Sequence, residues 1–172
     1  MSNVKIGINL EYARHGDKSF EWAVEKATEL GVTTIVPLAA ARSEKALLAA
    51  AAKRAERWRK ILLEASQQSR RVRVPLLQEV TKTETGFASG TEGMHVLFSE
   101  RAEAPPMRKV LDGQRATKAT LAIGPEGGWT EAELEAARCD GFQEASLGQL
   151  ILRTETAVVA ALAALNYSLG AE

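Results

Sequence analysis

A glycine-rich segment, Ile123-Gly-Pro-Glu-Gly-Gly128, has residue types and spacing suited to binding a ligand. It follows an apolar stretch, residues 119–123, typical of a strand, and precedes a segment from Thr130 typical of a helix. Glycines let the backbone approach a ligand closely and direct N–H groups at it, while Pro125 fixes the turn. The spacing alone leaves two interpretations equally open, a ligand-binding loop or a tight strand-to-helix connection.

The position and pattern of this loop narrow the ligand class. In open α/β sheets, ligands bind beyond the carboxyl ends of the strands, which is where this loop would lie. The spacing matches neither GxGxxG nor GxxxxGK[ST], so it argues against a dinucleotide fingerprint and a phosphate-binding P-loop. Thr130, followed by Glu133, predicts a capping box that fixes the start of the next helix.

A second segment, Leu147 to Ala157, places an apolar stretch before a charged and hydroxylated helix start. Residues 150–152 (Leu-Ile-Leu) have the size and character to wall an adenine-sized slot, where backbone amides would read the ring nitrogens. Spacing alone favours a plainer interpretation, in which Thr154 caps the helix and Glu155 complements its dipole.

These loops need a scaffold, and the hydrophobic pattern supplies one of α/β class. Alternation of strands and helices predicts a mostly parallel sheet with helices on both faces. The expected strands are 4–10, 32–38, 72–77, 95–99, 119–123 and 144–147; the expected helices are 20–30, 44–68, a short one within 104–115, 130–138 and 154–169. The polar stretch 78–93 is expected to be a surface connection, and 14–17 a turn.

Composition is that of one globular domain spanning residues 1–172. The 22 Lys and Arg residues balance the 22 Asp and Glu residues, so any electrostatic attraction to nucleic acid must be local. The single Cys139 rules out an internal disulfide and favours a reducing cytoplasm, and we expect it to be buried against the sheet. We expect no membrane insertion and no export.

The two glycine-containing segments together resemble the ribosomal RNA small subunit methyltransferase E family of the SPOUT superfamily. The similarity runs from about residue 5 to residue 169. It rests on these motifs: Ile123–Gly128, Gly141-Phe142, Leu147-Gly148, Ile151–Ala157, Lys26–Val32, Ile35–Pro37, Arg42-Ser43, Arg57-Trp58, Glu64–Ser69 with Arg71, and Val74-Pro75.

The resemblance implies methyl transfer from S-adenosyl-L-methionine to N3 of a uridine in small-subunit (16S) ribosomal RNA. It also implies a C-terminal trefoil knot that forms the cofactor pocket, and a homodimer. Two features depart from the family. Family members normally begin with a PUA-like RNA-binding domain, whereas this sequence starts almost at the first expected strand, and the family more often has proline and then a basic residue where Gln149 and Leu150 stand.

Site residues follow from the resemblance and from the chemistry of methyl transfer. Arg153 is expected to steady charge on the uridine carbonyl oxygens, with Glu155 orienting it or acting as base; Glu126 is a weaker candidate. The expected cofactor-binding residues are Leu97, Ser99, Glu100, Ile123, Gly124, Pro125, Glu126, Gly127, Gly128, Leu147, Gly148, Leu150, Ile151, Leu152 and Thr156. The expected RNA-binding residues are Arg42, Gln68, Arg70 and Arg71.

Other conspicuous side chains are interpreted as structural. His15 and His95 have no neighbours at metal-ligand spacing, so no metal site is expected. Trp22 and Trp58 are expected in the core or at a dimer interface, while Trp129 is equally compatible with a structural or a functional role. Two alternatives stay open: a related methyltransferase acting on another RNA, and a non-catalytic RNA- or ribosome-binding module.

Overall fold

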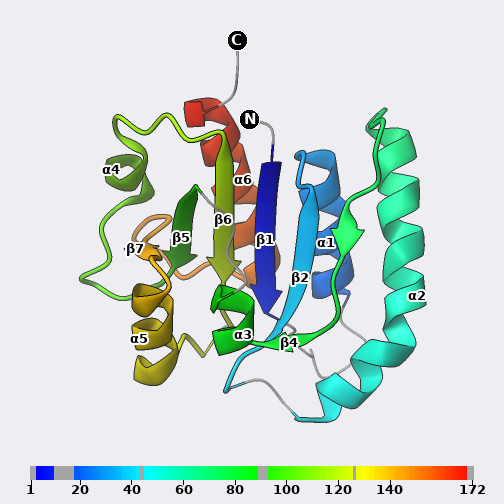
Figure 1. Ribbon diagram of the computed structural model, residues 1–172, viewed down its shortest axis with the longest axis horizontal. Helices are drawn as coiled ribbons and strands as arrows, with labels where there is room; N and C mark the ends of the chain where they lie inside the picture. Colours follow the sequence, from blue (N-terminus) through cyan, green and yellow to red (C-terminus); the bar gives the residue numbers. More distant parts are fainter. Residues whose placement is uncertain (1–2, 10–17, 43–44, 89–92, 126, 170–172) are drawn as a thin grey trace.

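A computed structural model describes residues 3–9, 18–42, 45–88, 93–125 and 127–169. Strands and helices alternate along the chain, as the hydrophobic pattern predicts (Figure 1). In chain order the elements are β1 (Asn3–Asn9), α1 (Ser19–Glu29), β2 (Thr34–Ala39), α2 (Lys45–Gln68), β3 (Leu76–Leu77), β4 (Thr81–Lys82), α3 (Thr83–Ala88), β5 (Met94–Phe98), α4 (Met107–Leu111), β6 (Lys118–Ile123), α5 (Glu131–Cys139), β7 (Gln143–Ala145) and α6 (Thr154–Leu169).

The strands form one sheet in the order β3-β2-β1-β6-β5-β7, with β4 also pairing with β2. All strand pairs in the described part of the chain are parallel. The carboxyl ends of β5 and β6 therefore lie at one edge of the sheet, which is the edge where the loops after these strands meet. The expected α/β class is confirmed.

Helices cover both faces of the sheet and create two separate cores. On one face α1 and α6 pack together against the sheet, with α2 outside α1, around side chains such as Ile6, Leu121 and Leu162. On the other face α3 and α5 enclose a smaller core that includes Leu97, Trp129 and Phe142 (Figure 1). Because successive side chains of a strand point to opposite faces, the central strands contribute to both cores.

Pro37 lies inside β2, which runs on to Ala39. The carbonyl of Ile35 accepts from Gln78 N on the side of β3, and alternate residues of a strand point the same way. The nitrogen of Pro37 therefore faces the gap between β3, which ends opposite Ile35, and β4, which begins opposite Leu38. A proline costs no ladder hydrogen bond at this position.

Two expectations about connections were wrong. The strand expected at 72–77 is reduced to Leu76–Leu77, because only these two of its residues pair with β2. The polar connection 78–93 contains strand β4 and helix α3, which closes the smaller core through buried Phe87. The expected turn at 14–17 and His15 lie outside the described residues.

Expectations about individual side chains were met in part. Trp58 is buried against Phe20, with ring centroids 4.7 Å apart, whereas Trp22 is 43% exposed. Cys139 is exposed rather than buried, because it lies on the solvent side of α5 and the side facing the sheet is occupied by Leu134 and Ala137. No helix in the described segments has the length and apolar character needed to cross a membrane.

Candidate functional site

The glycine loop and the 147–154 loop meet at the carboxyl ends of β5 and β6 and enclose a pocket of about 670 Å³, part of it open to solvent. Its place beyond the carboxyl ends of two parallel strands is where ligands bind in open α/β sheets. It is lined by Phe98, Ser99, Glu100, Ile123, Gly124, Pro125, Gly128, Trp129, Leu147, Gly148, Gln149, Leu150, Ile151, Leu152, Thr154 and Ala157.

The glycine loop is held in shape by a turn and by the Trp129 ring. The Gly128 N–H donates to the Pro125 carbonyl at 2.8 Å, and Gly128 has φ +70°, a conformation that favours glycine. A Cβ on Gly124 would stand 2.7 Å from the Trp129 ring, so this position has no room for a side chain. Trp129 Nε1 donates to the Phe98 carbonyl at 2.9 Å, which fixes the ring beneath the loop.

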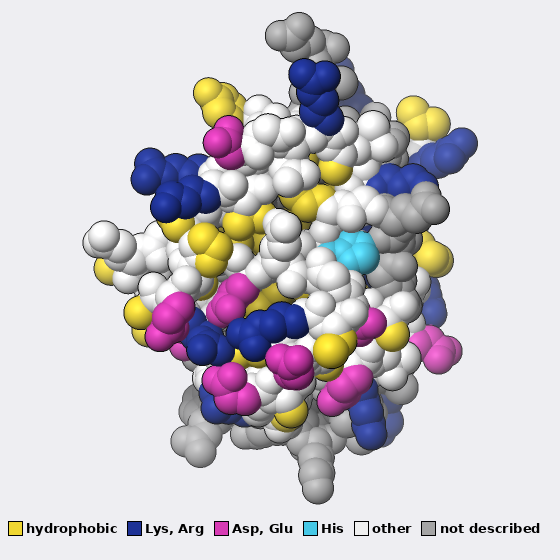
Figure 2. All heavy atoms as spheres, turned by 60° about the vertical axis from the view of Figure 1, so that its left-hand side comes forward, with side chains coloured by type: hydrophobic (Ala, Val, Ile, Leu, Met, Phe, Trp, Pro, Cys, Tyr) yellow, Lys and Arg dark blue, Asp and Glu magenta, His cyan; other side chains and the backbone are white. Residues whose placement is uncertain are grey.

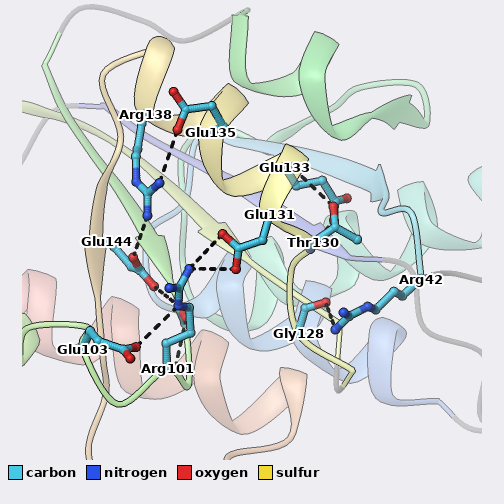
Figure 3. A network of polar contacts seen from close by, with 11 residues as sticks. Arg42, Arg101, Glu103, Gly128, Thr130, Glu131, Glu133, Glu135, Arg138 and Glu144 are labelled. Atoms are coloured by element: carbon cyan, nitrogen blue, oxygen red, sulfur yellow. Dashed lines mark hydrogen bonds and ion pairs between the residues drawn. The ribbon is translucent and has the colours of Figure 1, made fainter.

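The helix that follows the loop begins with the predicted capping box. The Glu133 carboxylate accepts from the Thr130 N–H at 2.9 Å, and the Glu133 N–H donates to the Thr130 hydroxyl at 3.3 Å (Figure 3). The same carboxylate also accepts from the Ala41 N–H at 2.9 Å and from the Thr83 hydroxyl at 3.1 Å. It therefore ties the start of α5 to the loop after β2 and to α3.

Glu133 is charged although it is buried. Burial would by itself raise the pKa of this carboxyl, but the hydrogen bonds from Thr130, Ala41 and Thr83 favour the ionised form and lower the pKa below its usual value. An ionised carboxylate accepts stronger hydrogen bonds than a neutral one, so these segments are held firmly together.

The second loop is linked to the first by a side chain at the start of α6. The Thr154 hydroxyl donates to the Gly124 carbonyl at 3.3 Å. The first hydrogen bond of α6 runs from the Ala157 N–H to the Arg153 carbonyl, so Arg153 stands at the cap position. The expectation that Thr154 caps the helix was therefore wrong, because its hydroxyl reaches across to the glycine loop.

Eleven of the expected cofactor-binding residues line the pocket, as the lining given above shows. Leu97 does not, because its side chain is buried in the smaller core on the other face of β5, and Phe98 lines the pocket instead. Gly127 and the exposed Thr156 also lie outside the lining, and Glu126 lies outside the described residues.

Five lining residues were missed by the sequence interpretation, namely Phe98, Trp129, Gln149, Thr154 and Ala157. Gln149 stands between predicted residues and could have been included on position alone. Phe98 and Ala157 carry no polar group that would single them out. Their role depends on the direction in which a strand end and a helix start face, which the local pattern does not give.

The candidate catalytic residues lie beside the pocket rather than in its lining. Arg153 is exposed and Glu155 is partly buried. Both are neighbours in the chain of the lining residue Thr154, so they stand at the rim where α6 begins. Their side chains make no hydrogen bond or ion pair with another described residue.

The candidate RNA-binding residues fall into two separate groups. Arg42 follows β2 and donates to the Gly127 carbonyl, with the Gly128 carbonyl 3.4 Å away (Figure 3). Gln68 and Arg70 are exposed at the opposite end of α2, whose 24 residues span about 36 Å. Arg71 is turned inward and donates to the Thr28 carbonyl at 2.6 Å, so the structure gives it a structural contact.

The side of the molecule formed by α5 and β7 carries charges of both signs that form ion pairs with one another. Arg101 lies 3.2 Å from Glu131 and 3.9 Å from Glu144, and Arg138 pairs with Glu135 at 3.3 Å (Figure 3). Figure 2 shows acidic and basic side chains interspersed on this side rather than gathered by sign. We therefore see no strongly charged patch there.

The fold and the pocket define a parallel α/β protein with a pocket at the carboxyl edge of its sheet. A family model described as an RNA methyltransferase domain matches residues 2–166. The chain belongs to this RNA methyltransferase domain family.

Curated relatives support the same family. The chain is 35% identical to the ribosomal RNA small subunit methyltransferase E of Synechocystis sp. over 173 residues, covering 96% of this chain and 54% of the relative. It is 36% identical to the enzyme of the same name from Bacillus subtilis, covering 88% of this chain and 62% of the relative. The chain thus spans between about half and two thirds of the length of these relatives, and the resemblance seen in the motifs is confirmed.

Solved structures agree. The ribosomal RNA small subunit methyltransferase E from Neisseria gonorrhoeae, bound to S-adenosyl methionine, superposes with a TM-score of 0.84 at 30% identity, covering 98% of this chain and 67% of that one. A methyltransferase from Legionella pneumophila, in complex with the cofactor SAM, superposes with a TM-score of 0.86 at 26% identity, covering 99% of this chain and 68% of that one.

Proposed function

We propose that this chain binds S-adenosyl-L-methionine and methylates N3 of a uridine in small-subunit (16S) ribosomal RNA. The observation that carries the proposal is the pocket between the glycine loop and the 147–154 loop, joined by the hydrogen bond from Thr154 to Gly124. Relatives with the same fold are small-subunit ribosomal RNA methyltransferases, and two neighbours hold S-adenosylmethionine.

The residues of the pocket suit such a cofactor. Apolar side chains of Leu147, Leu150 and Leu152 offer walls for a flat aromatic ring. Gly124 and Gly128 line the pocket, so their peptide groups can lie beside a ligand. The bound cofactor would supply an activated methyl group, so the chain's own task is to hold the acceptor in line with it and to keep water out.

Arg153 and Glu155 are proposed to serve the acceptor. A uridine loses the proton of its N3 imide before methylation, and the resulting negative charge spreads over two carbonyl oxygens. A guanidinium at the rim can steady this charge by charge-assisted hydrogen bonds. Glu155 can orient Arg153 or take up the proton, and its place on the first turn of α6 brings it to the same rim.

The partner and the setting are also proposed. Arg42, at the glycine loop, is the candidate for a phosphate or base contact near the pocket. Leu150 and Ile151 are 81% and 72% exposed at the pocket rim, which is consistent with cover by a second copy in a homodimer. A cytoplasmic location fits the ribosomal substrate.

The proposal is tested by incubating the chain with small-subunit ribosomal RNA and S-adenosylmethionine carrying a labelled methyl group. We expect label in the RNA, and digestion to nucleosides should yield 3-methyluridine. Label in another nucleoside would replace the proposed position. No label with ribosomal RNA or intact small subunits, from a chain that binds the cofactor, would contradict the enzymatic proposal and favour a non-catalytic RNA-binding module.

A further inference from the structure

The positive charge of this neutral chain is concentrated in one segment. Residues 45–74 contain nine of the 22 Lys and Arg residues but only two of the 22 Asp and Glu residues. They comprise α2 and the stretch that leads to β3, so the charge excess of the segment is borne by one edge of the molecule (Figure 1). A neutral protein can bind a polyanion through such a local excess.

The outer side of α2 presents this charge to solvent. Trp58, Leu62 and Ala65 bury the opposite side of the helix. Lys53 and Lys60 are exposed and seven residues apart, which aligns them along the outward face. Lys60 lies 3.8 Å from Glu64, but both side chains are more than 60% exposed, so the pair is weak.

Several cations on this surface form no ion pair with the residues that the structure describes. Arg57 pairs with Glu21 at 2.7 Å. By contrast, no carboxylate of a described residue forms an ion pair with Lys53, Arg59, Arg70 or Arg73. The α5 side differs, because its arginines are each held by glutamates there. Of the α2 side and the α5 side, only the α2 side therefore offers a polyanion cations that are not already paired with described carboxylates.

The backbone of Arg70 is in the left-handed conformation, which is strained for a residue other than glycine. Its φ is +56°, and it is the one described residue other than glycine with positive φ. The Arg71 N–H donates to the Ser66 carbonyl and the Arg70 N–H to the Gln67 carbonyl, which is the Schellman motif at the end of α2. The second-last position of this six-residue motif, which Arg70 occupies, is normally filled by glycine, because other residues are strained there.

The same motif ends two other helices, and there the expected residue is present. After α1 the left-handed position is Gly31, with φ +92°, and after α5 it is Gly141, with φ +80°. The chain thus uses glycine twice and accepts strain once, at an exposed arginine. Backbone strain of this kind points to a side chain kept for binding rather than for stability.

The surface around Arg70 also has groups suited to bases. Val72 is 98% exposed, and Leu76 is 60% exposed on strand β3. The Gln67 and Gln68 amides are exposed on the preceding turn. Apolar side chains can pack against base faces and amides can read base edges, while Arg70 and Arg73 supply contacts to phosphates.

We propose that the outer face of α2 together with residues 67–76, here called the α2 surface, is a docking surface for RNA, separate from the pocket. The inference rests on the proposed function for the identity of the polyanion. The helix starts at the edge of the sheet where the pocket lies and runs about 36 Å away from it. The nucleotides bound along α2 would therefore be some distance along the RNA from the base that enters the pocket.

The charge contribution is tested with two matched triple variants of the 172-residue chain. Lys53→Gln, Lys60→Gln and Arg73→Gln remove three charges from the α2 surface. Arg108→Gln, Lys109→Gln and Arg115→Gln remove three exposed charges around α4, on the far side of the molecule. Binding of a fluorescently labelled single-stranded RNA is measured by anisotropy at several salt concentrations.

We expect the α2 triple variant to lose about tenfold or more in RNA affinity, and its salt dependence to fall by about two in log–log slope, since each phosphate contact contributes about 0.7. The α4 triple variant should bind like the parent. Equal loss in both variants, or no loss in the α2 variant, would overturn the proposal. Calorimetric binding of S-adenosylmethionine should be the same in both, which separates this result from a failure of the pocket.

Arg70→Gly provides a second test, in which stability and RNA affinity are expected to change in opposite directions. A purely structural role of Arg70 would not produce this result. Glycine relieves the strain, so the melting temperature should rise by about 2 °C or more, while RNA affinity should fall several-fold. Arg70→Lys, which keeps charge and strain, should retain most of the affinity at the parent melting temperature. A variant Arg70→Gly that is more stable yet binds RNA normally, or that is less stable, would contradict the role assigned to Arg70.

Discussion

The carboxylate of Glu133 connects three segments of the chain that are far apart in sequence. It accepts hydrogen bonds from Thr130 at the start of α5, from Ala41 after β2 and from Thr83 at the start of α3. Ala41 precedes Arg42, which contacts the glycine loop from the other side. One buried side chain thus helps to position both the loop and the arginine beside it.

Replacing Glu133 by glutamine should be costly despite the similar shape. The amide has one acceptor oxygen, so its NH₂ group would face an N–H donor of Ala41 or Thr130. We expect a loss of about 2 kcal/mol in the free energy of unfolding, measured by urea denaturation at pH 7. Glu131→Gln, an exposed change on the same helix turn, is the control and should cost little.

The difference in stability between the parent and Glu133→Gln is expected to depend on pH. The pKa of Glu133 is lower in the folded state than in the unfolded chain, so its contribution is fully present above the unfolded pKa and is lost as pH falls through the folded pKa. The stability difference between the parent and Glu133→Gln should therefore narrow in acid. A difference that stays constant as pH is lowered would contradict the role of the ionised carboxylate.

Local sequence was informative about some of these contacts and silent about others. The capping box could be predicted because Thr130 and Glu133 are three residues apart and their geometry depends on one helix turn. The contacts to Ala41 and Thr83 join residues 92 and 50 positions apart, so they depend on the tertiary fold. Cys139 was misplaced because the phase of α5 was judged from residue type and not from its neighbours.

Among the elements, the start of α6 and the glycine loop act together. Thr154 is buried and donates to the Gly124 carbonyl, so the two walls of the pocket share a hydrogen bond. Neither loop has a complete pocket by itself, since the lining comes from both. The separation of the two walls should therefore respond to this one contact.

Thr154→Val tests that coupling between elements. Valine keeps the shape and removes the hydroxyl, so we expect the affinity for S-adenosylmethionine to fall about two- to tenfold, the equivalent of one hydrogen bond. Thr154→Ser should restore most of it. Thr156→Val, an exposed change on the same helix outside the lining, serves as the control. An unchanged affinity in Thr154→Val would show that the loops are held together by other contacts.

The bounds of the helices and strands were predicted better than the directions in which their side chains point. The long helix α2 and the final helix α6 begin and end close to the expected residues, because their patterns are long. In β5 the expectation took Leu97 for the pocket, yet the alternation of side chains turns Leu97 into the smaller core. Ahead of the short strand β3, the exposed Val72 and Val74 led to the wrong expectation of a longer strand, because β-branched residues indicate a strand even where no described strand pairs with them.

For the molecule as a whole, the alternation of strands and helices was sufficient to predict a parallel sheet covered on both faces. The charge asymmetry was not predicted, because the balance of charges over the whole chain hides the excess between residues 45 and 74. The separation of Arg42 from Gln68 and Arg70 by the length of α2 was also invisible in the motifs. The trefoil knot implied by the family resemblance stays a prediction.

The central claim is that the pocket binds S-adenosylmethionine, and calorimetric titration of the 172-residue chain with this cofactor and with S-adenosylhomocysteine tests it most directly. Ile151→Arg places a cation at the pocket rim, and Tyr167→Arg makes the corresponding change at an exposed site of α6. We predict saturable one-site binding by the parent and by Tyr167→Arg, and binding weakened tenfold or more in Ile151→Arg. No binding by the folded parent, or equal binding by Ile151→Arg, would contradict the account.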